Sequence, residues 1–193
     1  YLSGKLQELV DVARRVEERI GRKLDIVSGG ASSSYMRVLD GNIPEGITNL
    51  RIGEEILLPQ DLLYLYGYPL NGMYDDVFTL ESQVIEVRDK PSYPVGELGV
   101  DAFGHKPVYI DKGIRRKVLL AMGHLDYCDY KDLIPQDKDV EILGCSSDHT
   151  IMDVTDAPRT YHVGDIVKFN LIYGTNLFLC HSQNVQKVFI DEE

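Results

Sequence analysis

The sequence predicts a fold in two parts, an α/β segment over residues 1–76 followed by an antiparallel β domain over residues 77–193. Helix-like and strand-like stretches alternate in the first part, which is typical of βα units with parallel strands. In the second part, short strand-like runs are separated by Gly, Pro, Asp and Ser residues that form turns. This pattern is typical of an antiparallel domain or barrel.

The α/β segment is predicted to begin with an amphipathic helix over residues 2–20, because its apolar side chains recur three and four positions apart. After it, KLDIVSGG (23–30) predicts a short buried strand that enters a second helix over residues 33–39. ITNLRIG (47–53) predicts a second short strand, and PQDLLYLYG (59–67) predicts one or two further helical turns. The alternation therefore predicts two parallel strands joined by a helix.

The β domain is predicted from strand-like runs that are bounded by turn formers. We expect strands over residues 77–89, 106–113, 115–123, 140–144, 149–156, 164–174 and 184–191.

Charge and composition exclude several classes of partner. The formal net charge is −11 and the isoelectric point is near 4.9, whereas surfaces that bind nucleic acid or anionic membranes gather Lys and Arg. No apolar run approaches the roughly 20 residues that cross a bilayer, and the first residues lack the pattern of a signal peptide. We therefore expect a soluble, cytoplasmic protein without a nucleic-acid or membrane partner. Cys128, Cys145 and Cys180 are widely spaced, which predicts free thiols.

A candidate anion site lies in SGGASSSYMRVLDG (28–41), where a predicted strand ends in glycines and passes into serines at a helix start. Glycines allow close backbone approach, and both the free N–H groups and the hydroxyls are donors, so phosphate is a suitable ligand. An ordinary serine helix cap is the alternative. The second predicted strand also ends in a glycine, Gly53, shortly after Arg51. Two such exits match the phosphate site of (β/α)8 barrels, which lies after their last two strands.

A complete (β/α)8 barrel needs about 250 residues, far more than the α/β segment supplies. The chain also begins with Tyr1, inside a helical pattern. We therefore expect it to be the C-terminal portion of a longer protein.

Several motifs, in order along nearly the whole chain, resemble the alanine racemase family and within it the ornithine racemase-like branch. The most specific of them are LRIGE, LGCSSDHTIMDVTD and VGD. The resemblance implies an enzyme that uses pyridoxal 5′-phosphate (PLP) to interconvert L- and D-amino acids by removing and returning the Cα proton. It implies a homodimer with sites at the subunit interface. This chain would then hold the last two βα units of the (β/α)8 barrel and the C-terminal β domain.

The resemblance assigns two phosphate contacts to this chain. Ser33, with Ser32 and Ser34 as neighbours, falls at the serine that binds the cofactor phosphate. Gly53 and the backbone of Glu54 fall at the second phosphate contact.

Arg51 matches the arginine that faces the pyridine nitrogen of the cofactor. A guanidinium stays protonated, so the ring nitrogen would remain unprotonated and the cofactor would be a weaker electron sink. A surface ion pair with Glu54 or Glu55 is the alternative for this side chain.

In the β domain, AMGHLDY resembles the family's Gly-Tyr-x-Asp segment, whose tyrosine is an acid/base for the partner subunit's substrate. Gly123 and Asp126 agree with it, and His124 stands at the tyrosine. Because histidine exchanges protons near neutral pH, it could replace the tyrosine. It could instead contact the substrate side chain, in which case Tyr127 and Tyr130 are candidates for the second acid/base.

CSSDHTIMD resembles the segment that lines the partner's substrate entrance, and places Ser147 and Asp148 there. A carboxylate at that point suits a substrate with a distal amine, such as ornithine or lysine, although alanine stays open. Asp148 could instead cap the following turn. Phe189 falls near a family tyrosine that reaches the phosphate, and its phenyl ring cannot donate that hydrogen bond.

The family's Schiff-base lysine lies on a strand that this chain does not contain, so the chain alone is expected to be inactive. A non-catalytic PLP- or phosphate-binding protein of the same fold is the alternative function. A metal-dependent hydrolase using Cys145, Asp148 and His149 is a further alternative, but the spacing fits no zinc pattern and no metal site is predicted.

Overall fold

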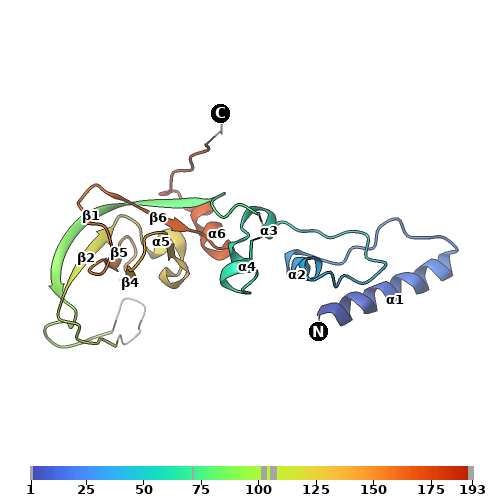
Figure 1. Cartoon of the computed structure of the whole chain (residues 1–193), viewed down its shortest axis with the longest axis horizontal. Helices are drawn as coiled ribbons and strands as arrows, with labels where there is room; N and C mark the ends of the chain where they lie inside the picture. The colour runs from blue at the N-terminus through green and yellow to red at the C-terminus, as the bar shows by residue number, and fades with distance from the viewer. Residues whose placement is uncertain (1, 71, 101–103, 105–107, 191–193) are drawn as a thin grey trace. The chain divides into compact units, whose positions relative to one another are not determined.

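The computed structural model describes residues 2–70, 72–100, 104 and 108–190, and the chain divides into two compact units, Tyr1–Val77 and Phe78–Glu193 (Figure 1). Each unit is described by itself. No helix of the described residues is both long and apolar enough to cross a membrane.

The first unit is built on helix α1 (Leu2–Ile20), which has the predicted bounds. Leu6, Val10 and Ala13 form its buried face. A Cβ on Gly29 would lie 3.2 Å from the side chain of Leu6 and only 2.8 Å from that of Ile47, so the chain passes close to the helix where glycine stands. Burial of this apolar face, rather than helix propensity alone, stabilises α1.

Short helices make up the rest of the first unit. They are a 3₁₀ turn at Ser32–Ser34, α2 (Tyr35–Leu39), α3 (Glu54–Leu57) and α4 (Gln60–Tyr64). The predicted second helix corresponds to the 3₁₀ turn and α2, and the predicted later turns correspond to α4.

The two predicted strands of the first unit are wrong as regular strands. Only one parallel bridge, between Ser28 and Asn49, joins the two segments. Asp25 and Ile26 of the first segment are exposed, Ile26 by 66%. Parallel strands need neighbouring strands and covered faces, and the described residues of this unit supply neither beyond this single pair.

The second unit contains one six-stranded sheet in the order β3-β6-β1-β2-β5-β4, with every paired neighbour antiparallel. The strands are β1 (Thr79–Pro91), β2 (Ile114–Leu120), β3 (Ile134–Pro135), β4 (Glu141–Cys145), β5 (Thr150–Asp153) and β6 (Ile166–Asn170). The predicted antiparallel β domain is therefore confirmed.

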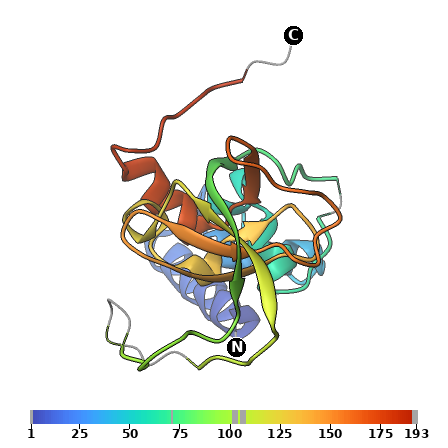
Figure 2. The same cartoon turned by 90° about the vertical axis from the view of Figure 1, so that its left-hand side faces the viewer.

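Strand β1 shapes this sheet. Its first half pairs with β6 from Thr79 to Gln83, and its second half pairs with β2, with a register shift between Val84 and Glu86. A bulge bends a strand and increases its twist, and the strand is visibly curved in Figures 1 and 2. Buried apolar side chains of β1, β2, β5 and β6 contribute to the core: Leu80, Val84, Val118, Leu120, Met152, Val167 and Phe169.

Helices α5 (His124–Tyr127) and α6 (Tyr173–His181) belong to the second unit, with a 3₁₀ turn at Tyr130–Asp132. The prediction of a strand over 164–174 is wrong at its end, because β6 stops at Asn170 and α6 begins three residues later. The apolar run continues through this change, so its composition does not separate strand from helix.

Two further predicted strands are absent from the described residues. Residues 108–113 and 184–190 hold no strand, and the ends of both predictions (106–107 and 191) lie outside the described ranges. Val188, Phe189 and Ile190 are exposed by 71%, 92% and 88%. Alternation alone does not make a strand where no neighbouring strand pairs with it.

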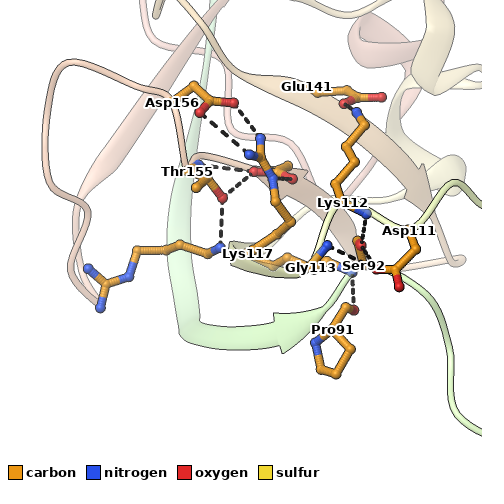
Figure 3. A network of polar contacts seen from close by, with 12 residues as sticks. Pro91, Ser92, Asp111, Lys112, Gly113, Lys117, Glu141, Thr155 and Asp156 are labelled. Atoms are coloured by element: carbon orange, nitrogen blue, oxygen red, sulfur yellow. Dashed lines mark hydrogen bonds and ion pairs between the residues drawn. The ribbon is translucent and has the colours of Figure 1, made fainter.

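A polar network connects the end of β1 and the start of β2 with strands β4 and β5 (Figure 3). Arg115 Nε donates to Asp153 Oδ2 at 2.8 Å, and the same guanidinium contacts Asp156. Lys112 Nζ donates to Glu141 Oε2 at 2.8 Å, and its backbone N–H donates to Ser92 Oγ at 2.6 Å. These contacts connect the loop before β2 to β1 and β4.

Candidate functional site

The first group of predicted site residues lies where residues 27–30 and 48–51 run side by side. Gly29 N donates to Asn49 O at 2.9 Å, and Arg51 N donates to Gly30 O at 2.7 Å. The first segment therefore ends next to Arg51, two residues before Gly53, which agrees with the expectation that these two segments end at the same place.

The serine hydroxyls have three different environments. Ser32 is buried, and its Oγ accepts hydrogen bonds from Gly53 N at 3.4 Å and Glu54 N at 3.1 Å. Ser34 is also buried and donates to Gly29 O at 2.9 Å. Ser33, between them, is exposed. The structure thus brings the serine turn and the start of α3 together, and leaves the Ser33 hydroxyl facing solvent.

Arg51 lies at the same end of this segment pair. Its side chain is exposed, and Nη1 donates to Ser28 Oγ, which in turn donates to Asn49 Oδ1 at 2.9 Å. Within the described part of the chain, no ion pair joins Arg51 to Glu54 or Glu55. The structure therefore does not support the alternative of a surface ion pair.

A carboxyl cluster in α3 and α4 was not predicted. Burial, a hydrogen bond with Asp61 and the charges of Asp61 and Glu55 raise the pKa of Glu54 to about 7. Glu55, Gln60 and Asp61 are buried, and one oxygen of each has no hydrogen-bond partner. Acidic residues within the apolar stretch GEEILLPQDLL were the available sequence indication.

Glu54 is expected to make the stability of the protein depend on pH. Its pKa is about 7 in the folded chain and 4.5 as an ordinary carboxyl, so the folded state binds this proton more tightly. The stabilisation is complete below pH 4.5 and is lost as the pH rises through 7. We expect Glu54→Gln, which keeps a donor toward Asp61, to reduce the fall in melting temperature between pH 5 and pH 8, measured by circular dichroism.

Glu18→Gln is the matched control, because Glu18 is an exposed residue of α1. It should leave the pH dependence unchanged. An unchanged dependence in Glu54→Gln as well would contradict the assignment of this proton to the Glu54–Asp61 pair.

The second group of site residues lies where the start of α5 meets the turn between β4 and β5. His124 N donates to Ser146 O at 2.9 Å, and Leu125 N donates to Ser147 O at 3.1 Å. A Cβ on Gly123 would lie 2.3 Å from Ser147 O and 2.4 Å from Asp148 N. Only glycine permits this approach, which brings His124 beside the predicted substrate residues Ser147 and Asp148.

The turn itself is held by Ser146. Its Oγ accepts hydrogen bonds from Asp148 N at 3.4 Å and His149 N at 3.1 Å, and its backbone N–H donates to His149 O at 2.8 Å. Ser146 therefore does the capping that the sequence alternative gave to Asp148. The side chains of Ser147 and Asp148 are exposed, and His124 is half-buried.

The structure places the other candidate aromatic residues differently. Tyr127 is 1% exposed, burial raises its pKa, and its hydroxyl lies 2.6 Å from Thr150 Oγ1. It is therefore a core residue and an unsuitable acid/base. Tyr130 is half-buried, with Lys131 Nζ 6.0 Å from its ring centroid. Phe189 is exposed by 92%.

The alternative of a metal-dependent hydrolase lacks a ligand set. Among the residues that the structure describes, no group of three or more His, Cys, Asp or Glu side chains is placed to hold a metal ion.

No model of a known protein family matches the chain. It is 48% identical over 185 residues to the ornithine racemase of Acetoanaerobium sticklandii, covering 96% of this chain and 52% of that protein. The predicted resemblance is confirmed. The lysine racemase of Thermotoga maritima is 40% identical over 185 residues, covering 96% of this chain and 51% of that protein.

The chain spans about half the length of these racemase relatives, which is consistent with a C-terminal portion. Solved structures show the same fold. The alanine racemase of Pseudomonas aeruginosa matches with a TM-score of 0.55 and 18% identity, covering 93% of this chain and 50% of that chain. The D-threonine aldolase of Filomicrobium marinum matches with a TM-score of 0.52 and 14% identity, covering 90% of this chain and 41% of that chain.

Proposed function

We propose that this chain is the C-terminal portion of a PLP-dependent racemase that acts on a basic amino acid. The contact of Ser32 Oγ with Gly53 N and Glu54 N carries the proposal, because it brings together two segments that the family resemblance assigns to one phosphate. The identities of 48% and 40% to an ornithine racemase and a lysine racemase support the reaction and a substrate with a distal amine.

The residues of the first unit suit the phosphate end of this cofactor. The N–H groups of Gly53 and Glu54 converge on one oxygen acceptor, Ser32 Oγ, and the exposed Ser33 hydroxyl is a further donor. Converging N–H groups and hydroxyls are the donors that proteins use for phosphate. Arg51 would stand at the pyridine nitrogen. When bound, the cofactor would stabilise the negative charge that forms at Cα.

The residues of the second unit suit the substrate side of the reaction. His124 would give or take the Cα proton, because an imidazole exchanges protons near neutral pH. Asp148 is exposed beside it and would accept hydrogen bonds from the distal ammonium of ornithine or lysine, with Ser147 as its neighbour. An ammonium paired with this carboxylate would favour basic amino acids over alanine.

The proposal includes the assembly that the resemblance implies. The last two βα units of a (β/α)8 barrel would be completed by chain outside these residues, which would also supply the lysine that holds the cofactor covalently. Two copies would form a cytoplasmic homodimer, with the second unit of one copy facing the cofactor of the other.

The test is made on the full-length protein that contains this chain. We expect purified protein with PLP to show the absorbance of a lysine-bound cofactor and to racemise L-ornithine or L-lysine faster than L-alanine, measured by chiral chromatography. The 193-residue chain alone is expected to be inactive. Cofactor binding without racemisation would indicate the non-catalytic alternative, and absence of cofactor binding would overturn the proposal.

A variant tests the phosphate site separately. Ser33→Ala removes a donor to a charged ligand, so we expect the Kd for PLP to rise about tenfold, by the roughly 1.5 kcal/mol or more that such hydrogen bonds contribute. Ser3→Ala, in the first turn of α1, is the control and should leave the Kd unchanged. An unchanged Kd in Ser33→Ala would remove Ser33 from the phosphate site.

A further inference from the structure

We propose that Asp126, together with Ser182, is a positioning residue for His124: their hydrogen bonds hold the start of α5 against the turn that carries Ser147 and Asp148. This rests on the proposed function only for the role of His124 in proton transfer. The positioning itself stands on the contacts of the second unit.

Both carboxylate oxygens of Asp126 are occupied. Oδ2 accepts from Gly123 N at 3.0 Å and Oδ1 accepts from Ser182 Oγ at 3.0 Å, while the residue is only 7% exposed. Asp126 N also donates to Gly123 O at 2.9 Å, so Gly123 and Asp126 exchange two hydrogen bonds across the first turn of α5. Because Gly123 directly precedes His124, the hydrogen bonds that fix Gly123 also constrain the backbone of His124.

Helix α5 needs such contacts because it has only four residues. Isolated helices of this length are unstable in water, so external partners set its position. Gly123 N contacts Asp126, and His124 N and Leu125 N donate to the turn between β4 and β5. Removing the Asp126 contact would take away the hydrogen bond of Gly123 N, so the position of the start of α5 would depend on the two bonds to the turn.

Ser182 connects this cap to a second element. It directly follows α6, where its N–H donates to Phe178 O at 2.9 Å and its Oγ accepts from Asn184 N at 3.2 Å. The same Oγ donates to Asp126. The end of α6 therefore fixes the carboxylate that fixes Gly123, although Ser182 lies 56 positions further along the chain than Asp126.

Asp126 acts here as a hydrogen-bond acceptor. A positioning role needs only this acceptor, whereas an electrostatic role would need the negative charge of the carboxylate. Within the described residues no salt bridge to Asp126 is present. An asparagine can reproduce the geometry, because its Oδ1 can accept from Gly123 N while its Nδ2 donates to Ser182 Oγ, which has two acceptor lone pairs. Asp126→Asn should therefore rescue what Asp126→Ala loses.

The experiment measures racemisation and amide exchange on variants of the full-length protein. We expect Asp126→Ala to lower kcat by roughly 10- to 100-fold with little change in KM, because small misplacements of a reacting group cost this much. Ser182→Ala should lower kcat several-fold, and Asp126→Asn should stay close to wild type. Amide exchange at Gly123 and His124, followed by NMR, should accelerate in the order of the kcat losses.

Asp165→Ala is the matched control, because Asp165 accepts from His162 N at 2.8 Å in a turn before β6 and should leave kcat unchanged. Asp126→Asn that loses as much kcat as Asp126→Ala would overturn positioning in favour of a charge effect. Faster exchange with unchanged kcat would overturn it as well. If Asp126→Ala does not fold, Ser182→Ala decides, and no effect on its exchange or kcat overturns the inference. If the wild-type protein does not racemise, the proposed function fails, and amide exchange still decides whether Asp126 and Ser182 hold α5.

Discussion

Replacing Gly123 with alanine is expected to destabilise the second unit by about 3 kcal/mol, since overpacking a close contact costs this order of free energy. The new Cβ would lie 2.3 Å from Ser147 O and 2.4 Å from both Asp148 N and Ser147 C. These are backbone atoms, so no side chain can rotate away, and the turn must separate from α5. Urea unfolding followed by circular dichroism measures the loss.

Gly174→Ala is the control for this substitution. Gly174 lies in the first turn of α6, and apart from its chain neighbours and the backbone of its own helix, no atom lies within 4 Å of its added Cβ. Alanine is a better helix former than glycine, so this variant should be neutral or slightly more stable. Equal stabilities of the two variants would show that α5 and the turn do not touch as described.

Replacing Thr150 with valine is expected to lower the free energy of unfolding by about 2–3 kcal/mol, because it leaves buried polar groups without a hydrogen-bond partner. Thr150 is fully buried, and its Oγ1 donates to Met122 O at 2.8 Å and lies 2.6 Å from the Tyr127 hydroxyl. Valine has nearly the same shape but no hydroxyl, so Tyr127 and Met122 would lose their partner. The free energy of unfolding in urea measures this effect.

Tyr127→Phe distinguishes a lost hydrogen bond from a packing defect. Alone it should cost about 1 kcal/mol, the net value of a typical hydrogen bond. The double variant with Thr150→Val has no tyrosine hydroxyl that could be left without a partner. The combined loss of unfolding free energy should therefore be smaller than the sum of the single losses. Strict additivity would contradict the proposed chain of hydrogen bonds.

The sequence predicts elements well where their pattern matches their burial. Helix α1 has the bounds that its apolar spacing predicts. Strands β5 and β6 lie within predicted runs, and β1 and β2 match theirs except for one or two residues at one end. The failures share a physical cause. Residues 23–30 and 184–190 carry strand-like composition, but strands form only where neighbours pair with them, and that information is not local.

The candidate site was predictable at the level of segments. Ser32, Gly53 and Glu54 meet in one place, as do His124 and Ser147, and both groupings agree with what the family resemblance implies. The partners of these residues were not predictable. Ser182 reaches Asp126 from across 56 positions, which no spacing rule indicates. The raised pKa of Glu54 depends likewise on burial beside Asp61, which sequence alone does not reveal.

The turn between β4 and β5 is held in a way that bears on the evolution of substrate specificity. Its contacts with α5 run through main-chain atoms, the carbonyls of Ser146 and Ser147 and the N–H groups of His124 and Leu125. Main-chain contacts do not depend on which side chain a residue carries. The side chains at positions 147 and 148 can therefore be exchanged with little loss of folding free energy. Under the proposed function, changes at these two positions would adapt one scaffold to amino acids of different charge and length.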